Sequence, residues 1–206
     1  MTGLLIIIAT AYLIGSIPFG LILGKLAGIG DIRKTGSGNI GATNMLRAGG
    51  KKLALLTLLL DAGKGFLAVQ LGGGLAVTAL FVVIGHCYPV WLKFRGGKGV
   101  ATAFGALLAL SFPQVNEALF GVTGNLGVLV GGTWLLVFLA TGYSSLAALV
   151  SGIALIVVLS ITGLLESSLF LILLDVLVLY RHKGNIRRLL AGEEKKFSLR
   201  SQKEKT

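Results

Sequence analysis

Three polar stretches interrupt an otherwise apolar chain, and each combines glycines with lysine or arginine. They read GSGNIGATNMLRAGGKK at 36–52, GHCYPVWLKFRGGKGVATAFG at 85–105 and YRHKGNIRRLLAGEE at 180–194. Glycines leave backbone N–H groups free to converge on an anion, and nearby cations add positive charge around it. One phosphate does not require so many cations, so the three stretches together predict a site that holds two phosphorylated substrates.

The first stretch has the spacing of a dinucleotide-binding loop but lacks its context. Gly36, Gly38 and Gly41 spell G-x-G-x-x-G, and Asp61 follows twenty residues after Gly41. That fingerprint requires a strand before it and a βαβ unit around it, whereas strongly apolar runs lie on both sides here. The stretch alone leaves two interpretations open, an anion-binding loop and a tight glycine-rich turn.

The second stretch places Lys93, Arg95 and Lys98 around Gly96 and Gly97. A further glycine then leads into an apolar run, so the loop precedes a helix N-terminus, where backbone donors and the helix dipole favour a phosphate. The G-x-x-x-x-G-K-[ST] spacing does not occur, so neither a Walker A loop nor a nucleoside triphosphate is indicated.

Two histidines accompany these loops. His86 lies near the end of an apolar run, where it either packs between helices or contributes to the site. His182 and Asn185 are three residues apart, so they share one face if the helix continues, and neither residue type serves as a membrane anchor. A single cysteine with two histidines cannot supply the four ligands of a closed zinc site, so no metal is expected.

Asp61 and Lys64 are charged residues within a predicted membrane span. They are three positions apart, so one turn of helix can pair them and lower the cost of placing either in lipid. A structural ion pair is the expected arrangement. The alternative is that Lys64 faces a polar cavity.

The elements that must position these residues are membrane helices. Of 206 residues, 54% are apolar and 13% are charged, and the mean hydropathy is +0.89, which is too apolar for a water-soluble globule. Several apolar runs approach the ~20 residues that cross a bilayer. We therefore predict an all-α integral membrane protein, a bundle of about seven transmembrane helices, in the runs 3–24, 53–71, 75–92, 100–112, 128–141, 146–163 and 169–180.

The cations are distributed unevenly along the chain. Of the 19 Lys and Arg residues, six lie in 25–52, three in 93–98 and nine in 181–206, whereas the loops on the other side have none. The positive-inside rule then places the basic loops and the C-terminus in the cytoplasm and the N-terminus outside. An odd number of spans agrees with this orientation. The pattern does not define the topology of segment 111–132.

In this order and spacing, the three stretches resemble the bacterial membrane acyl-phosphate:glycerol-3-phosphate acyltransferase family, and GSIPFG at 15–20 extends the resemblance over nearly the whole chain. It implies a seven-span bundle in the bacterial cytoplasmic membrane, with the active site facing the cytoplasm. The implied reaction transfers a fatty acyl group from acyl phosphate to the 1-hydroxyl of glycerol 3-phosphate. The products are lysophosphatidic acid and inorganic phosphate, in the first committed step of phospholipid synthesis. The catalytic domain would be residues 1–192, followed by a basic cytoplasmic tail, 193–206.

Carried over by position, the resemblance implies catalytic roles for Ser37, Arg47, His182 and Asn185 and a structural role for Glu193. Asp61 is also expected to be structural, because of its ion pair with Lys64. The resemblance and the charge pattern together indicate as substrate-binding residues Asn39, Lys51, Lys52, Lys64, His86, Lys93, Arg95, Gly96, Gly97, Lys98 and Gly99. Catalysis would rest on proximity and on electrostatic stabilisation of two bound anions. Either His182, held by Asn185, or a phosphate oxygen of a substrate accepts the hydroxyl proton.

The resemblance implies no metal, no cofactor and no nucleic-acid partner. Its partners are acyl phosphate, glycerol 3-phosphate, membrane lipid and, as a candidate, the soluble enzyme that forms acyl phosphate. The chief alternative is a membrane carrier for a phosphorylated small solute, which would also use basic loops and intramembrane charges. Cations on one side only and the lack of repeated halves argue against a carrier. A membrane anchor for a soluble enzyme would leave His182 and Asn185 without a role.

Overall fold

The computed structural model describes residues 2–110, 126–162 and 168–197, and the regular secondary structure within them is helical. Each of the seven apolar runs expected to form a helix contains one, so the all-α fold class is confirmed; residues 111–125 lie outside the described part. The helices are α1 Thr2–Ser16, α2 Phe19–Leu26, α3 Ala42–Leu71, α4 Ala76–Cys87, α5 Val100–Leu110, α7 Leu126–Thr141, α8 Ser144–Ile161, α9 Leu169–Arg181 and α10 Lys183–Leu190, with 3-10 turns η1 Ile32–Lys34 and η2 Val90–Leu92.

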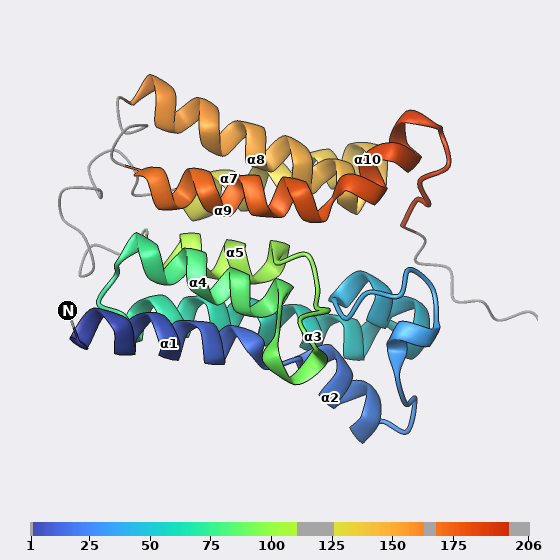
Figure 1. Ribbon diagram of the computed structural model, residues 1–206. Coiled ribbons are helices and arrows are strands. Elements are labelled where there is room, and N and C mark those ends of the chain that lie inside the picture. The colour runs from blue at the N-terminus through green and yellow to red at the C-terminus, as the bar shows by residue number, and fades with distance from the viewer. Residues whose placement is uncertain (1, 111–125, 163–167, 198–206) are drawn as a thin grey trace, which may run out of the picture.

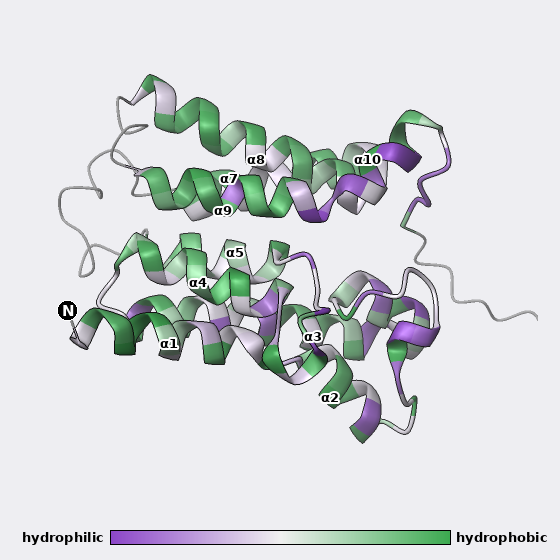
Figure 2. Ribbon diagram, in the orientation of Figure 1, coloured by the Kyte–Doolittle hydropathy of each residue, from purple (hydrophilic) through white to green (hydrophobic). Residues whose placement is uncertain are grey.

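Two layers of helices lie against each other along their length (Figure 1). One layer contains α1, α3, α4 and α5, and the other contains α7, α8 and α9. Successive long helices run in opposite directions, so the α2–α3 and α4–α5 connections and the α9–α10 junction lie at one end of the bundle. Figure 2 shows hydrophilic residues gathered at this end. The three polar stretches, far apart in sequence, therefore meet there.

Apolar side chains pack together where the layers meet and also cover the outside. Val83 of α4, Leu107 of α5 and Leu174 of α9 are buried in one apolar cluster. Leu59 of α3 and Leu136 of α7 are exposed instead. Exposed apolar surface is unfavourable in water, and the outer faces of this bundle suit lipid.

Within the described residues, three helical segments are long and apolar enough to cross a bilayer, namely Thr2–Leu26, Ala42–Leu71 and Ser144–Ile161. Shorter apolar helical segments, Ala76–Leu92, Val100–Leu110 and Leu126–Thr141, accompany them. The chain is thus an integral membrane protein by its helices and composition. Seven spans and the sides occupied by the termini stay predictions.

Helix α3 bends between its polar and apolar parts. At Gly50 the backbone has φ 80° and ψ −176°, which is outside the helical region and is readily adopted by glycine because it lacks a Cβ. Part of the first polar stretch, residues 42–49, is therefore helical and not a loop. This short segment presents Asn44 and Arg47 at the polar end of the bundle.

The ion pair that sequence spacing predicts is present at the end of α1. Lys64 Nζ lies 2.8 Å from Asp61 Oδ1, and both side chains are buried. Lys64 also donates a hydrogen bond to the Ile17 carbonyl (2.8 Å). That carbonyl lies at the break between α1 and α2, where Pro18 has no N–H to continue the helix, and an unpaired carbonyl inside a membrane is costly. Both contacts of Lys64 are internal to the bundle.

Helices α3 and α5 pack closely because each has a glycine where they cross. A Cβ at Gly65 would overlap the Thr102 carbonyl, and a Cβ at Gly105 would overlap the Ala62 carbonyl. Small residues allow backbones to approach in this way in membrane proteins. The contact fixes α5, and with it the loop that precedes its first turn.

Candidate functional site

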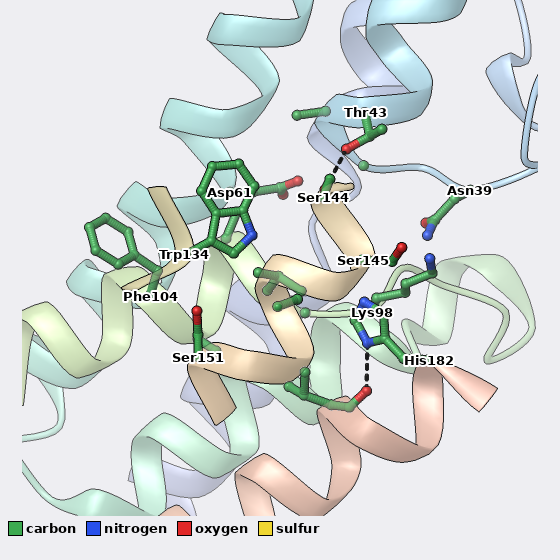
Figure 3. A pocket seen from close by; sticks show the side chains of 18 of the residues that line it. Asn39, Thr43, Asp61, Lys98, Phe104, Trp134, Ser144, Ser145, Ser151 and His182 are labelled. Carbon is green, nitrogen blue, oxygen red and sulfur yellow. Dashed lines mark hydrogen bonds between the residues drawn. The ribbon is translucent and has the colours of Figure 1, made fainter. Parts of the chain in front are cut away.

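A cavity of about 620 Å³ extends from the polar end of the bundle into its apolar interior, between α3, α5, α7, α8 and α9. Figure 3 shows Asn39, Lys98, Ser145 and His182 at one part of the cavity and Phe104 and Trp134 at another. The polar end is lined by Ser37, Asn39, Asn44, Arg47, Lys98, Ser145, His182, Asn185, Arg188, Glu194 and Lys195, and the interior by residues such as Leu58, Phe104, Leu107, Val130, Leu155 and Leu174. The cavity is therefore amphipathic.

Asn44 organises the first polar stretch. Its Oδ1 accepts hydrogen bonds from the Ser37 N–H (2.8 Å) and Oγ (3.2 Å). Its Nδ2 donates to the carbonyls of Ile32 (2.7 Å) and Asn39 (2.8 Å). Gly36 has φ +60°, and a Cβ there would overlap the Asn44 amide oxygen, so only glycine allows the backbone to wrap around this buried side chain. Ser37 is thereby fixed at the cavity wall.

Arg47 and Asn39 retain groups that a ligand can use. Arg47 lines the cavity and has no hydrogen bond or ion pair with any described residue, so its planar guanidinium can bind an oxyanion in a bidentate manner. Asn39 accepts a hydrogen bond from the Ile40 N–H through Oδ1 (2.7 Å). Its amide N–H groups face the cavity beside Lys98 (Figure 3).

The Gly96–Gly97 segment is held from two sides. The Gly97 N–H donates to the His86 carbonyl (3.0 Å), and Arg181 donates to the carbonyls of Gly96 (2.9 Å) and Gly97 (3.0 Å). A Cβ at Gly97 would overlap the His86 imidazole. This buried histidine therefore packs beneath the loop, and the clamp directs Lys98, the next residue, into the cavity.

Lys98 begins a hydrogen-bond network that joins the second polar stretch to the third. Its Nζ donates to Asn185 Oδ1 (2.5 Å), and Asn185 Nδ2 donates to Glu194 Oε1 (2.6 Å). Glu194 also accepts from Ser145 Oγ (2.7 Å) at the start of α8 and from Arg188 Nε (2.6 Å). Burial alone would raise the pKa of Glu194, but these three hydrogen bonds lower it below its usual value. An ionised Glu194 therefore joins α8 and α10 to the segment that follows α10.

The Lys98 ammonium group lines the cavity, where it can bind an anion. Burial lowers its pKa to about 8, opposed by the charge of Glu194 and assisted by the positive charges of Arg188 and Arg47. At pH 7 most of the Lys98 side chains are still cationic. A phosphate arriving beside Lys98 would offset the surrounding positive charge.

His182 presents one ring nitrogen to the cavity. Its Nδ1 lies 2.8 Å from the Val178 carbonyl, which can only accept, so Nδ1 carries the proton (Figure 3). In the neutral ring Nε2 is then an acceptor. Burial, together with the nearby Lys98 charge, lowers the pKa of His182 to about 4, opposed by the hydrogen bond with Val178. The imidazole is neutral at pH 7 and able to accept a proton from a hydroxyl group.

The predicted residues fall into two groups. Those that line the cavity are Ser37, Asn39, Arg47, Asp61, His86, Lys98, Gly99, His182 and Asn185. Outside the lining, Lys51, Lys52, Lys93 and Arg95 are exposed, Gly96 and Gly97 shape the loop, and Lys64 is in the ion pair. Glu193 is exposed, and the structural contacts expected of it are made by Glu194.

Sequence reasoning missed five residues that organise the polar end, namely Asn44, Ser145, Arg181, Arg188 and Glu194. Asn44 lies within the first stretch, but it carries no charge and has no distinctive spacing that would mark it. Arg181 directly follows an apolar run, a position typical of an arginine that anchors a membrane helix at the interface. Ser145 lies in an apolar run without any signal, and nothing in the sequence separates Glu194 from its neighbour.

The segment after α10 packs against the second layer. The Phe197 N–H donates to the Gly142 carbonyl (2.7 Å), and the Phe197 ring meets Phe138 of α7 edge-on at 4.9 Å between centroids. Phe197 also lines the cavity, as does Lys195. Residues 194–197, assigned from sequence to the tail, thus contribute to the site.

Comparison with known proteins identifies the relatives of this chain. A sequence model of the family described as "Glycerol-3-phosphate acyltransferase" matches residues 5–192. Proteins of that name from Roseobacter denitrificans and Maricaulis maris are 47% and 48% identical over 192 and 203 residues, covering 90% and 94% of this chain and 90% and 88% of theirs. Crystal structures of an integral membrane glycerol 3-phosphate acyltransferase, in its glycerol 3-phosphate and lysophosphatidic acid forms, superimpose with TM-scores of 0.82 and 0.80. They are 39% and 38% identical to this chain, and each match covers 95% of this chain and 96% of the other.

Proposed function

The chain belongs to the glycerol-3-phosphate acyltransferase family, and from that premise we propose that it transfers a fatty acyl group from acyl phosphate to the 1-hydroxyl of glycerol 3-phosphate. The products would be lysophosphatidic acid and inorganic phosphate. The observation that carries the proposal is the amphipathic cavity, since cations at one end and apolar residues at the other fit a ligand with a phosphate head and an alkyl chain.

The reaction needs little covalent chemistry from the protein. Acyl phosphate is an activated mixed anhydride, so the substrate hydroxyl oxygen can attack the carbonyl carbon directly. A new ester C–O bond forms, and the bond between the carbonyl carbon and the phosphate oxygen breaks, with phosphate leaving. The protein holds two anions together and orients the hydroxyl, which is catalysis by proximity and electrostatic stabilisation.

The polar end provides separate groups for two phosphates. Arg47 of α3 and Lys98, just before α5, both line the cavity and are our candidate cations for the two charged heads. Arg188 is partly neutralised by Glu194, with Nε 2.6 Å from Oε2, so its main role is to hold the network. The Ser37 hydroxyl and the Asn39 amide are the neutral donors at the same end, suited to a phosphate oxygen or the polarised carbonyl.

His182 is our candidate for the general base. A pKa of about 4 makes it a weak base in the free protein, since general bases work best with a pKa near the operating pH. Two bound phosphates bring negative charge close to the ring and raise that pKa. His182 Nε2 would take the hydroxyl proton as the ester bond forms and return it to the leaving phosphate. Substrate binding thus activates the base.

We also propose that the polar end faces the cytoplasm of a bacterial inner membrane and that seven helices cross it. The gathering of Lys and Arg side chains at one end supports this orientation. Cys87 is buried, so cysteines introduced one at a time at exposed positions such as Lys93 would report their side. Labelling by an impermeant thiol reagent from outside intact cells would contradict the orientation.

The deciding experiment is an activity assay on purified protein in lipid or detergent. Acyl phosphate and glycerol 3-phosphate supplied together should give equal amounts of inorganic phosphate and lysophosphatidic acid. Phosphate released without glycerol 3-phosphate, or no lysophosphatidic acid, would contradict the proposal. A carrier forms no new covalent product, so the same assay separates that alternative.

Two variants test the assigned roles. Ser37→Ala and His182→Ala should lower kcat strongly, by about 10²-fold or more for loss of a general base. Ser160→Ala, at an exposed position on α8 outside the cavity lining, is the matched control. Equal losses in all three variants would mean that the effect is not at the cavity.

A further inference from the structure

The apolar part of the cavity contains a carboxyl group that the proposed reaction does not use. Asp175 of α9 is 5% exposed and lines the cavity among apolar residues. Its carboxylate has no hydrogen bond or ion pair with any residue in the described part of the chain. An ionisable side chain inside a membrane is expensive to bury and usually marks a function.

The neighbouring helix is built to make room for this carboxyl group. Asp175 lies against Gly152 of α8, and a Cβ at Gly152 would overlap Asp175 Oδ1. Gly152 lines the same cavity. The helix contact therefore accommodates the carboxyl group without giving it a hydrogen-bonding partner.

A second unpaired polar atom belongs to a residue in the lining of the same cavity. Trp134 of α7 lines it, and the indole Nε1 is buried without a hydrogen-bond partner among the described residues. The ring stacks on Phe138 at 4.8 Å between centroids, which fixes its orientation. A buried donor left unpaired costs free energy, as a buried acceptor does.

One ligand group offers a partner to both kinds of atom. A hydroxyl donates one hydrogen bond and accepts others, so it suits a carboxylate acceptor and an indole donor alike. An ammonium group lacks an acceptor, and a ketone lacks a donor. The ligand expected in this apolar region is the acyl chain, so the hydroxyl would be a substituent of that chain.

We propose that Asp175 and Trp134 form a subsite that favours acyl donors with a hydroxyl group along the chain. The proposal rests on the proposed acyl transfer. Asp175 precedes His182 by seven residues on α9, which is about 10 Å along the helix axis. The favoured hydroxyl would thus lie in the middle of the chain, well away from the reacting carbonyl.

The test compares two acyl phosphates of equal length, one plain and one with a mid-chain hydroxyl, on the purified full-length protein. We expect kcat/KM for the hydroxylated donor to be about tenfold higher, the factor given by one hydrogen bond to a buried polar group. Asp175→Leu should remove or reverse that ratio, and Asp175→Asn, which keeps an acceptor, should retain part of it. Trp134→Phe keeps the ring but loses the N–H and should reduce the ratio.

Two outcomes would overturn the proposal: equal kcat/KM for the two donors in the wild-type protein, or an unchanged ratio in Asp175→Leu. The wild-type comparison decides the matter if the leucine variant does not fold. If neither donor is turned over, the proposed function fails and binding alone tests the subsite. A monoalkyl phosphate with a mid-chain hydroxyl should then raise the Tm more than its plain counterpart, and an equal Tm shift would overturn the subsite.

Discussion

Replacing Glu194 by glutamine should impair the protein far more than the same change at Glu193. Glu194 accepts hydrogen bonds from Asn185, Ser145 and Arg188 and so holds the Asn185 amide that meets Lys98. The exposed Glu193 has none of these contacts. The two adjacent residues thus form a matched pair, equal in charge and composition but different in structure.

The size of the effect follows from the bonds lost. A hydrogen bond to a charged group contributes about 1.5–3 kcal/mol, whereas the Arg188 side chain is 43% exposed, so its pairing contributes only about 0.5 kcal/mol. A glutamine keeps one acceptor oxygen and loses the charge. Losing about one charge-assisted bond, or about 2 kcal/mol, predicts a fall of about 30-fold in kcat/KM for glycerol 3-phosphate.

The assay measures initial rates over a range of glycerol 3-phosphate concentrations at saturating acyl phosphate, for wild type, Glu194→Gln and Glu193→Gln. Thermal unfolding of each protein in the same detergent shows whether the loss comes from unfolding. We expect Glu193→Gln to remain within about twofold of wild type, because surface changes typically alter stability by less than about 0.5 kcal/mol. Similar losses in both variants, or no loss in Glu194→Gln, would refute the proposed network.

Three further predictions concern the same end of the bundle. The value of kcat/KM for glycerol 3-phosphate should fall as pH rises through about 8, because Lys98 is cationic below its pKa of about 8 and neutral above it. Lys98→Arg should remove this fall from the pH–rate profile. Gly97→Ala should lower both Tm and activity, since the new methyl group would overlap the imidazole beneath the loop, whereas Gly63→Ala, where nothing lies within 4 Å, should do neither. Removing residues after Phe197 should leave kcat near wild type, whereas removing everything after Gly192 should abolish activity, which an assay of the two truncated proteins would show.

Charge and hydropathy were enough to predict the long helices and the end of the bundle at which the polar stretches meet. The apolar runs located each long helix because a membrane span must satisfy its backbone within the segment, and the clustering of cations identified the end at which the site would form. Spacing predicted the Asp61–Lys64 pair because residues three apart meet on a helix. Patterns within one stretch of sequence therefore predicted the contacts that form within that stretch.

The contacts that build the cavity are not local, and the sequence did not reveal them. Ser145 and Glu194 are 49 residues apart, and no periodicity relates them. The charge of Lys64 also suggested a phosphate ligand, whereas in the structure this side chain pairs with Asp61 and donates a hydrogen bond to the backbone carbonyl at the Pro18 break. Asp175 was passed over because one carboxylate hardly alters the hydropathy of its run.

The hydrogen bond between Lys98 and Asn185 joins residues 87 positions apart, and this separation bears on how the protein is made. The ribosome delivers the chain from its N-terminus, so the early helices can enter the membrane well before α10 emerges. Until then Lys98 lacks its partner, and the segment that contributes Glu194 does not exist. A nascent or interrupted chain would therefore sit in the membrane without a phosphate site, and would neither bind nor consume substrate until synthesis had passed the last helix.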